Sequence, residues 1–156
     1  MAAINETTPQ RVALGLAASG GQVTPIDSAN PLPMASAVQG AAGGITTFRR
    51  LATADTNAAI VKAGAGRVYG YTIANPSAAA KFVRLYNKAT LPNPAADSAL
   101  IIRTIMIPAG GIASYHLGAG MAGFTNGIGI AATGAIADND ATALAANDLI
   151  IHVDYA

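Results

Sequence analysis

The stretch RVYGYTIANPSAAAKFVRLYNKA, residues 67–89, decides how we interpret the fold. Aromatic and β-branched residues alternate with other side chains on both sides of the sequence NPSA, which is the two-residue period of β-strands. NPSA itself is typical of a turn. We therefore predict two strands that pair as a hairpin.

The alternation also assigns side chains to faces of these two strands. In the first strand one face carries Val68, Gly70 and Thr72, and the other carries Tyr69, Tyr71 and Ile73. In the second strand one face carries Phe82, Arg84 and Tyr86, and the other carries Val83 and Leu85. The simplest, purely structural interpretation of the stretch is a hairpin whose aromatic residues enter the core and whose cations border it.

Further strand patterns follow at short spacing from Ile45 onward, separated by Gly, Pro and Asn. They are ITTFRRLATA (45–54), ALIIRTIMIP (99–108), GIASYHL (111–117), MAGFT (121–125), GIGIAAT (127–133) and DLIIHVDYA (148–156). The nearly continuous apolar run of residues 99–108 predicts a central strand buried on both faces. Seven or eight such strands predict an all-β fold, an antiparallel β-sandwich or jelly roll. The one helical candidate is a single turn at residues 140–147, capped by Asp140.

Residues 1–44 differ from the rest because Pro residues and Gly pairs interrupt every regular period. We predict an extended N-terminal arm with a short strand at Arg11 to Leu16, followed by a β-sandwich domain over residues 45–156. An isolated arm of this kind buries too little surface to offset its ordering entropy, so we expect a partner to hold it.

Composition indicates a thin core. Apolar residues make up 52% of the 156 residues, but 37 of them are Ala, whose methyl group contributes less on burial than a Leu, Val or Phe side chain. Contacts between subunits would supply further burial. We therefore expect a homo-oligomer, with a trimer favoured.

Charge is sparse and unevenly distributed. The net charge is +1, which gives no overall attraction to nucleic acid or membranes, and no apolar run reaches the length of a membrane span. Eight of the nine Lys and Arg lie within residues 49–103, whereas residues 104–156 contain four Asp and no Lys or Arg. Either these charges pair within one fold, or they pair between subunits.

The motifs that resemble chemical sites are weak. GAGMAG (118–123) has the spacing of a dinucleotide-binding loop, but turn and strand signals follow it where a helix is needed. DND (138–140) lacks the later ligands of a calcium loop and reads as a turn with side-chain hydrogen bonds. His116 and His152 have no Cys or Glu nearby and no evident base-orienting partner. We predict no catalytic, metal or cofactor site and no enzymatic activity.

The stretch 67–89 and the charge distribution leave contacts with other proteins as the sharper hypothesis, since Tyr and Arg are favoured at interface anchors. Stacking of single-stranded nucleic acid is disfavoured because the spacing of the cations alternates faces on a strand. The candidate contacts with another subunit or another protein are Arg49, Arg50, Tyr69, Tyr71, Arg84, Tyr86, Asp138 and Asp140.

Several segments together resemble a group of small virion proteins of tailed bacteriophages. The segments are KAGAGRVYG (62–70), RLYNKA (84–89), IPAGG (107–111), GIGIA (127–131) and ADNDATALAAND (137–148). The resemblance covers about residues 55–156 and leaves the arm unmatched. It is moderately specific as a set, while each motif alone is weak.

The resemblance implies a structural virion protein, with capsid decoration (cement) proteins as the expected type: jelly-roll-like sandwiches, often trimers, bound to the major capsid protein. The expected location is the capsid surface, after synthesis in the bacterial cytoplasm. It supplies no binding residues. A tail, baseplate or head-fibre module and a ligand- or carbohydrate-binding β-sandwich remain alternatives, although the chain has no Trp for stacking on sugars.

Overall fold

A computed structural model of the chain describes residues 15–17, 23–25, 44–118 and 120–156. The chain divides into two compact units, Met1–Ala37 and Val38–Ala156. In the first unit, β1 (Gly15–Ala17) and β2 (Val23–Pro25) form an antiparallel pair. The remainder of the predicted arm, including most of the strand expected at Arg11 to Leu16, lies outside the described residues.

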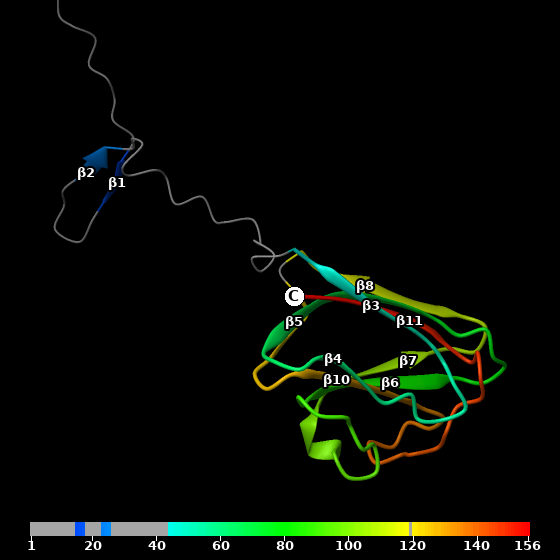
Figure 1. The fold of residues 1–156 in the computed structure, drawn as a ribbon. Coiled ribbons are helices and arrows are strands. Elements are labelled where there is room, and N and C mark those ends of the chain that lie inside the picture. Colours follow the sequence, from blue (N-terminus) through cyan, green and yellow to red (C-terminus); the bar gives the residue numbers. More distant parts are fainter. Residues whose placement is uncertain (1–14, 18–22, 26–43, 119) are drawn as a thin grey trace, which may run out of the picture. The chain divides into compact units, whose positions relative to one another are not determined.

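The second unit consists of two antiparallel sheets that face each other (Figure 1). One sheet has the order β3 (Thr46–Leu51), β11 (Ile150–Tyr155), β5 (Gly66–Ala74), β8 (Ile112–His116), and β9 (Ala122–Phe124) pairs with the beginning of β5. The other has the order β4 (Ala59–Lys62), β10 (Ile128–Thr133), β6 (Lys81–Asn87), β7 (Ile101–Ile107). The predicted all-β sandwich is confirmed.

Strand pairing follows one long hairpin that is folded over on itself. At its tip β6 pairs with β7, and moving outward β5 pairs with β8, β4 with β10 and β3 with β11. Because this hairpin bends across both layers, β3, β4, β5 and β6 alternate between the two sheets. This topology is the jelly roll.

The hairpin predicted for residues 67–89 is therefore wrong. Strands β5 and β6 form, but they belong to different sheets, and the residues between them carry the chain from one layer to the other. The buried side chain of Asn75 anchors this corner, because its amide donates to the carbonyl oxygens of Ala79 (2.9 Å), Ile107 (3.1 Å) and Pro108 (3.0 Å). A turn signal alone does not distinguish such a corner from a hairpin.

The core lies between the sheets, and β6 and β10 are the central strands of one of them. All six residues of β10 are buried. The apolar run at β7 is not central, contrary to the prediction, since β7 is an edge strand. Ile105 and Ile107 enter the core, while other side chains of β7 are exposed, including Ile102 (46%) and Met106 (59%).

The predicted faces of β6 are confirmed, whereas those of β5 change along the strand. Val68 and Ile73 are both fully buried in the core, although they were assigned to opposite faces. The register shifts where Asp154 pairs with Gly70 and Tyr155 pairs with Val68, so β5 contains one additional residue. A β-bulge of this kind reverses the alternation, which explains the error.

The predicted helical turn at residues 140–147 is not helical. The described residues contain one short 3₁₀ turn, Ser98–Leu100, in the connection between β6 and β7. Within the described part of the chain, no helix is long and apolar enough to cross a membrane.

Candidate functional site

The outer face of β6 is the most unusual part of the domain because it is polar and yet buried. Arg84 and Tyr86 project from this face, away from the core, and neither has exposed surface. Two long connections, residues 88–100 and 134–149, lie beneath this sheet in Figure 1, on the side away from the other sheet. The covering of β6 by these segments makes it a strand buried on both faces.

Arg84 is held mainly by uncharged acceptors. One Nη donates to Thr133 Oγ1 (2.5 Å), and the other donates to the carbonyl oxygens of Ala135 (3.0 Å) and Ala137 (2.5 Å). The nearest carboxylate oxygen in an ion pair with it is Asp138 Oδ1, at 4.0 Å from Nε. Arg84 thereby fixes the covering segment 134–138 to β6.

Tyr86 lies two residues further along the same face, and burial raises the pKa of its phenol. The neighbouring Arg84 lowers the pKa in part, while Asp97 and Asp138 raise it further. The hydroxyl is therefore protonated at neutral pH. Among the described residues, neither the Tyr86 hydroxyl nor Arg84 Nε has a hydrogen-bond partner, although both atoms are buried.

Asp140 organises the covering segment. It accepts hydrogen bonds from the backbone N–H groups of Ala135 (2.8 Å) and Thr142 (3.2 Å) and from the Thr142 hydroxyl (2.6 Å). Burial by itself raises the pKa of this carboxyl, but the hydrogen bonds outweigh it and lower the pKa to about 2. The turn with side-chain hydrogen bonds that was predicted for residues 138–140 is confirmed.

Charges of the middle and the tail of the chain meet within the fold. Lys81 Nζ lies 2.7 Å from Asp148 Oδ2, and Arg84 lies beside Asp138. Lys88 also binds Asp97, which ties the segment after β6 to the base of the 3₁₀ turn. The intrachain explanation of the charge distribution is the one that these contacts support.

The eight predicted contact residues are not brought together. Arg84 and Tyr86 are buried within the domain, so we withdraw the surface contacts predicted for them. Of the arginines on β3, Arg50 donates to Asn57 Oδ1 (3.1 Å), whereas Arg49 is exposed and pairs across strands with His152. The other predicted residues are Tyr69, which is buried, Tyr71, which stacks on Tyr115 at 6.2 Å between ring centroids, the exposed Asp138, and Asp140.

A second polar cluster, missed in the sequence, lies on the outer face of the other sheet. His116 Nδ1 is 3.5 Å from Asp154 Oδ2, and its Nε2 is 3.2 Å from Thr72 Oγ1. Thr47 donates to Asp154 (2.6 Å), and Thr72 also contacts Ser114 (3.2 Å). His116 thus has a carboxylate partner, contrary to the expectation from sequence spacing.

The imidazole of His116 lies over Gly70, where an added Cβ would be 2.2 Å from Nδ1. The glycine therefore permits β8 and β11 to interact across β5. A hydroxyl, an imidazole and a carboxylate in a row can in principle transfer a proton. This row lies on a solvated face, however, with 56% of the His116 side chain exposed, and we interpret it as a network that ties three strands together.

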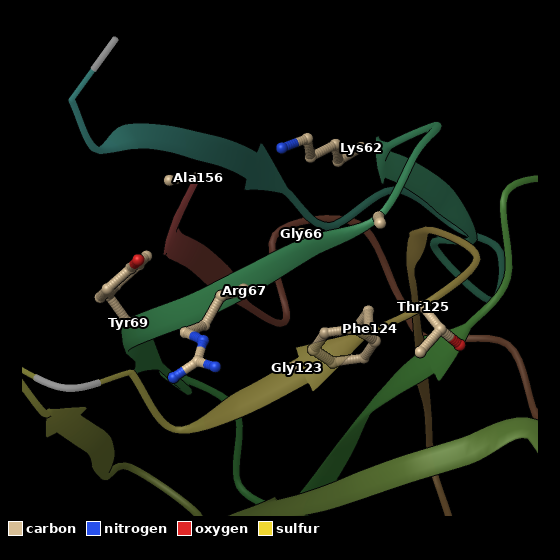
Figure 2. A pocket seen from close by; sticks show the side chains of 9 residues that line it. Lys62, Gly66, Arg67, Tyr69, Gly123, Phe124, Thr125 and Ala156 are labelled. Atoms are coloured by element: carbon tan, nitrogen blue, oxygen red, sulfur yellow. The ribbon is translucent and has the colours of Figure 1, made fainter. Parts of the chain in front are cut away.

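A shallow cavity of about 590 Å³ lies at the beginning of β5. Lys62, Arg67 and Thr125 contribute polar groups, and Phe124 contributes an apolar wall. Figure 2 shows that the side chains of Lys62 and Arg67 extend in different directions and do not converge on one point. This arrangement lacks the convergent polar groups that fix a ligand.

Within the described residues, no group of three or more His, Asp or Glu is arranged to hold a metal ion. No family model, curated protein or solved structure matches the chain.

Proposed function

We propose that this chain is a structural protein of a tailed-bacteriophage virion, most specifically a capsid decoration protein that binds the outer shell and stabilises the junctions between capsomers. The observation that carries the proposal is the set of sequence motifs that resembles those of small virion proteins of tailed bacteriophages. These motifs all fall within the second unit: on strands β4, β5, β6 and β10, on the turn from β7 to β8, and on the connection between β10 and β11.

The motifs have identifiable structural roles in this domain. KAGAGRVYG (62–70) covers the end of β4 and the bulged part of β5, and RLYNKA (84–89) contains the buried face of β6. IPAGG (107–111) connects β7 to β8, and the ADND motif contains the Asp140 turn that organises the cover over β6. The resembling segments thus include residues of the covered strand β6 and of its cover, which supports the proposal.

Exposed apolar side chains support assembly. Ile102 and Met106 are exposed on edge strand β7, and Ile112 (66% exposed) lies on edge strand β8. Contacts between subunits or with the capsid would bury these side chains and add to the thin Ala-rich core. We propose a homo-oligomer, with the trimer as the favoured state.

Residues 1–44 have a distinct part in the proposal. Their Pro- and Gly-broken sequence suits an extended segment that lies along a neighbouring subunit and is ordered by that contact. By adding buried area across capsomer junctions, the bound protein would resist expansion of the shell under the pressure of the packaged genome.

A binding experiment with empty shells of the corresponding phage, prepared without this protein, tests the proposal. Full-length protein and a variant that begins at Ile45 are each mixed with shells and sedimented. Full-length protein should cosediment at a saturable ratio and raise the temperature at which the shells rupture, while the truncated variant should bind weakly or not at all.

Density for the chain on the shell surface of an intact virion would locate the site directly. Density in the tail or in fibres would replace the decoration role by the tail or head-fibre alternative. Absence from purified virions, or no binding by the full-length chain, would contradict a virion role.

A further inference from the structure

The hydrogen-bonding needs of Arg84 and Tyr86 point to a ligand within the covered face of β6. Arg84 Nε and the Tyr86 hydroxyl are both buried, and neither has a partner among the described residues. Buried polar groups in folded proteins are nearly always hydrogen-bonded, because desolvation without a partner is costly. Two such groups on one face of a single strand point to a common explanation.

The two groups belong to one polar cluster. Residues 84 and 86 project from the same face of β6, with Cα atoms about 7 Å apart on a strand. Both side chains are long, and Arg84, Asp97 and Asp138 all act electrostatically on the Tyr86 hydroxyl. The segment that Arg84 holds through the carbonyl oxygens of Ala135 and Ala137 covers this face of β6.

The position of Asp138 indicates which kind of ligand would satisfy Arg84 Nε and the Tyr86 hydroxyl. Its Oδ1 is 4.0 Å from Arg84 Nε, which is too long for a hydrogen bond but suits two polar groups that share a water molecule. A water molecule can accept from Arg84 Nε and donate to Asp138, and it can also bond to the Tyr86 hydroxyl. Three partners are the usual number for a buried water.

We infer that one structural water molecule bridges Arg84 Nε, the Tyr86 hydroxyl and the Asp138 carboxylate, and thereby fastens the segment 134–140 to β6. The ligand is neutral because the guanidinium already has the Asp138 carboxylate beside it, and Asp97 adds a second negative charge to the surroundings of Tyr86. An inorganic anion would place a further negative charge between these carboxylates.

The substitution Tyr86→Phe tests the inference through the sign of the change in melting temperature. If the hydroxyl is bridged, the full-length Y86F protein should melt at a temperature lower by about 2–4 °C. If the hydroxyl is unpartnered, its removal relieves a desolvation penalty, and Y86F should melt at the same or a higher temperature, which would overturn the inference. Tyr115→Phe is the matched control because Tyr115 is 42% exposed, and its melting temperature should not change.

Asp138 provides the second pair of variants. Its side chain is 68% exposed, so neither substitution endangers folding. Asp138→Asn keeps an acceptor for the water, whereas Asp138→Ala removes it. Hydrogen exchange of the Arg84 Nε–H, followed by NMR, should be slow in the unaltered protein and in D138N and at least several-fold faster in D138A. Equal exchange in all three proteins would overturn the role of Asp138.

A high-resolution crystal structure grown in bromide identifies the ligand. We expect a density peak within hydrogen-bonding distance of Arg84 Nε and the Tyr86 hydroxyl, without anomalous signal from bromide. An anomalous peak would show an anion in place of water, and an empty site would show that the two groups are unpartnered; either result overturns the inference.

Discussion

Asp140 is the residue whose ionisation matters most to the cover over β6. Three hydrogen bonds to its carboxylate hold the backbone of residues 135–142 in its conformation, and the charged carboxylate accepts them more strongly than the protonated acid does. Because the folded pKa of about 2 lies below the usual value of 3.8, the carboxylate stabilises the fold fully above about pH 4. This contribution is lost as pH falls towards 2.

We therefore predict that Asp140→Asn lowers the free energy of unfolding at pH 7, and that the difference from the unaltered protein narrows between about pH 4 and pH 2. Urea unfolding at a series of pH values measures both. A difference in the free energy of unfolding that stays constant over this pH range would contradict the proposed link between Asp140 ionisation and stability.

The ion pair between Lys81 and Asp148 should be stronger than the other pairs on the surface. Its atoms are 2.7 Å apart and both side chains are largely buried, at 14% and 13% exposure. A double-mutant cycle with Lys81→Met and Asp148→Asn should give a coupling of about 1–2 kcal/mol. The pair of Arg50 and Asp55, at 3.8 Å and more exposed, serves as the control and should couple by less than about 0.5 kcal/mol. Equal couplings would show that burial of the first pair has no energetic effect.

The sequence predicted individual turns better than it predicted individual side-chain environments. The Asp140 turn is local, since Asp140 and its partners lie within a few residues, and it was predicted correctly. The burial of Arg84 depends on a segment some fifty residues away, which no local pattern reports. The pairing of His116 with Asp154 was missed for the same reason, since it depends on which strands lie side by side.

At the scale of strands, β10 and the turn before it leave no room for additional atoms. A Cβ at Gly127 would lie 2.7 Å from Ala89 Cα and 2.9 Å from the Lys62 carbonyl oxygen, and both of these are backbone atoms that cannot turn aside. We predict that Gly127→Ala lowers the free energy of unfolding by about 1–3 kcal/mol through overpacking.

Gly123 on β9 is the matched control, since nothing lies within 4 Å of an added Cβ there. Gly123→Ala should be neutral or slightly stabilising. Chemical denaturation of both variants provides the comparison, and similar losses in the two would rule out crowding at Gly127 as the cause.

Strand positions were predictable because alternation is a local property, and most predicted runs became strands. Partners and faces were less predictable. The core-facing alternation of β5 reverses at a bulge, and the apolar run of β7 belongs to an edge strand with Ile102 and Met106 exposed. In a sequence, apolar residues that a partner protein covers cannot be distinguished from apolar residues that lie in the core.

At the scale of the whole molecule, that exposed surface on β7 leads to a prediction about association. If subunits bury Met106, Met106→Lys should weaken the oligomer by at least tenfold in dissociation constant while leaving the melting temperature of the dissociated protein unchanged. Sedimentation velocity over a range of concentrations tests this.

Ala141→Lys is a suitable control, since this exposed residue lies on the 134–149 connection and not on β7. A protein that remains monomeric at all concentrations would contradict the expected homo-oligomer. Dissociation that is equal in the two variants would place the contact elsewhere.

The nested strand pairing also sets the order in which the chain is able to fold. Among the described strands, β3 pairs with β11 alone, so Thr46 cannot form its strand pairing until Tyr155 has been synthesised. During synthesis, most strands of the jelly roll have therefore left the ribosome before β11 is available to pair with β3. Such non-local pairing is typical of domains that fold in milliseconds to seconds, and until β11 emerges, one face of the core stays open to chaperones, to neighbouring chains and to aggregation.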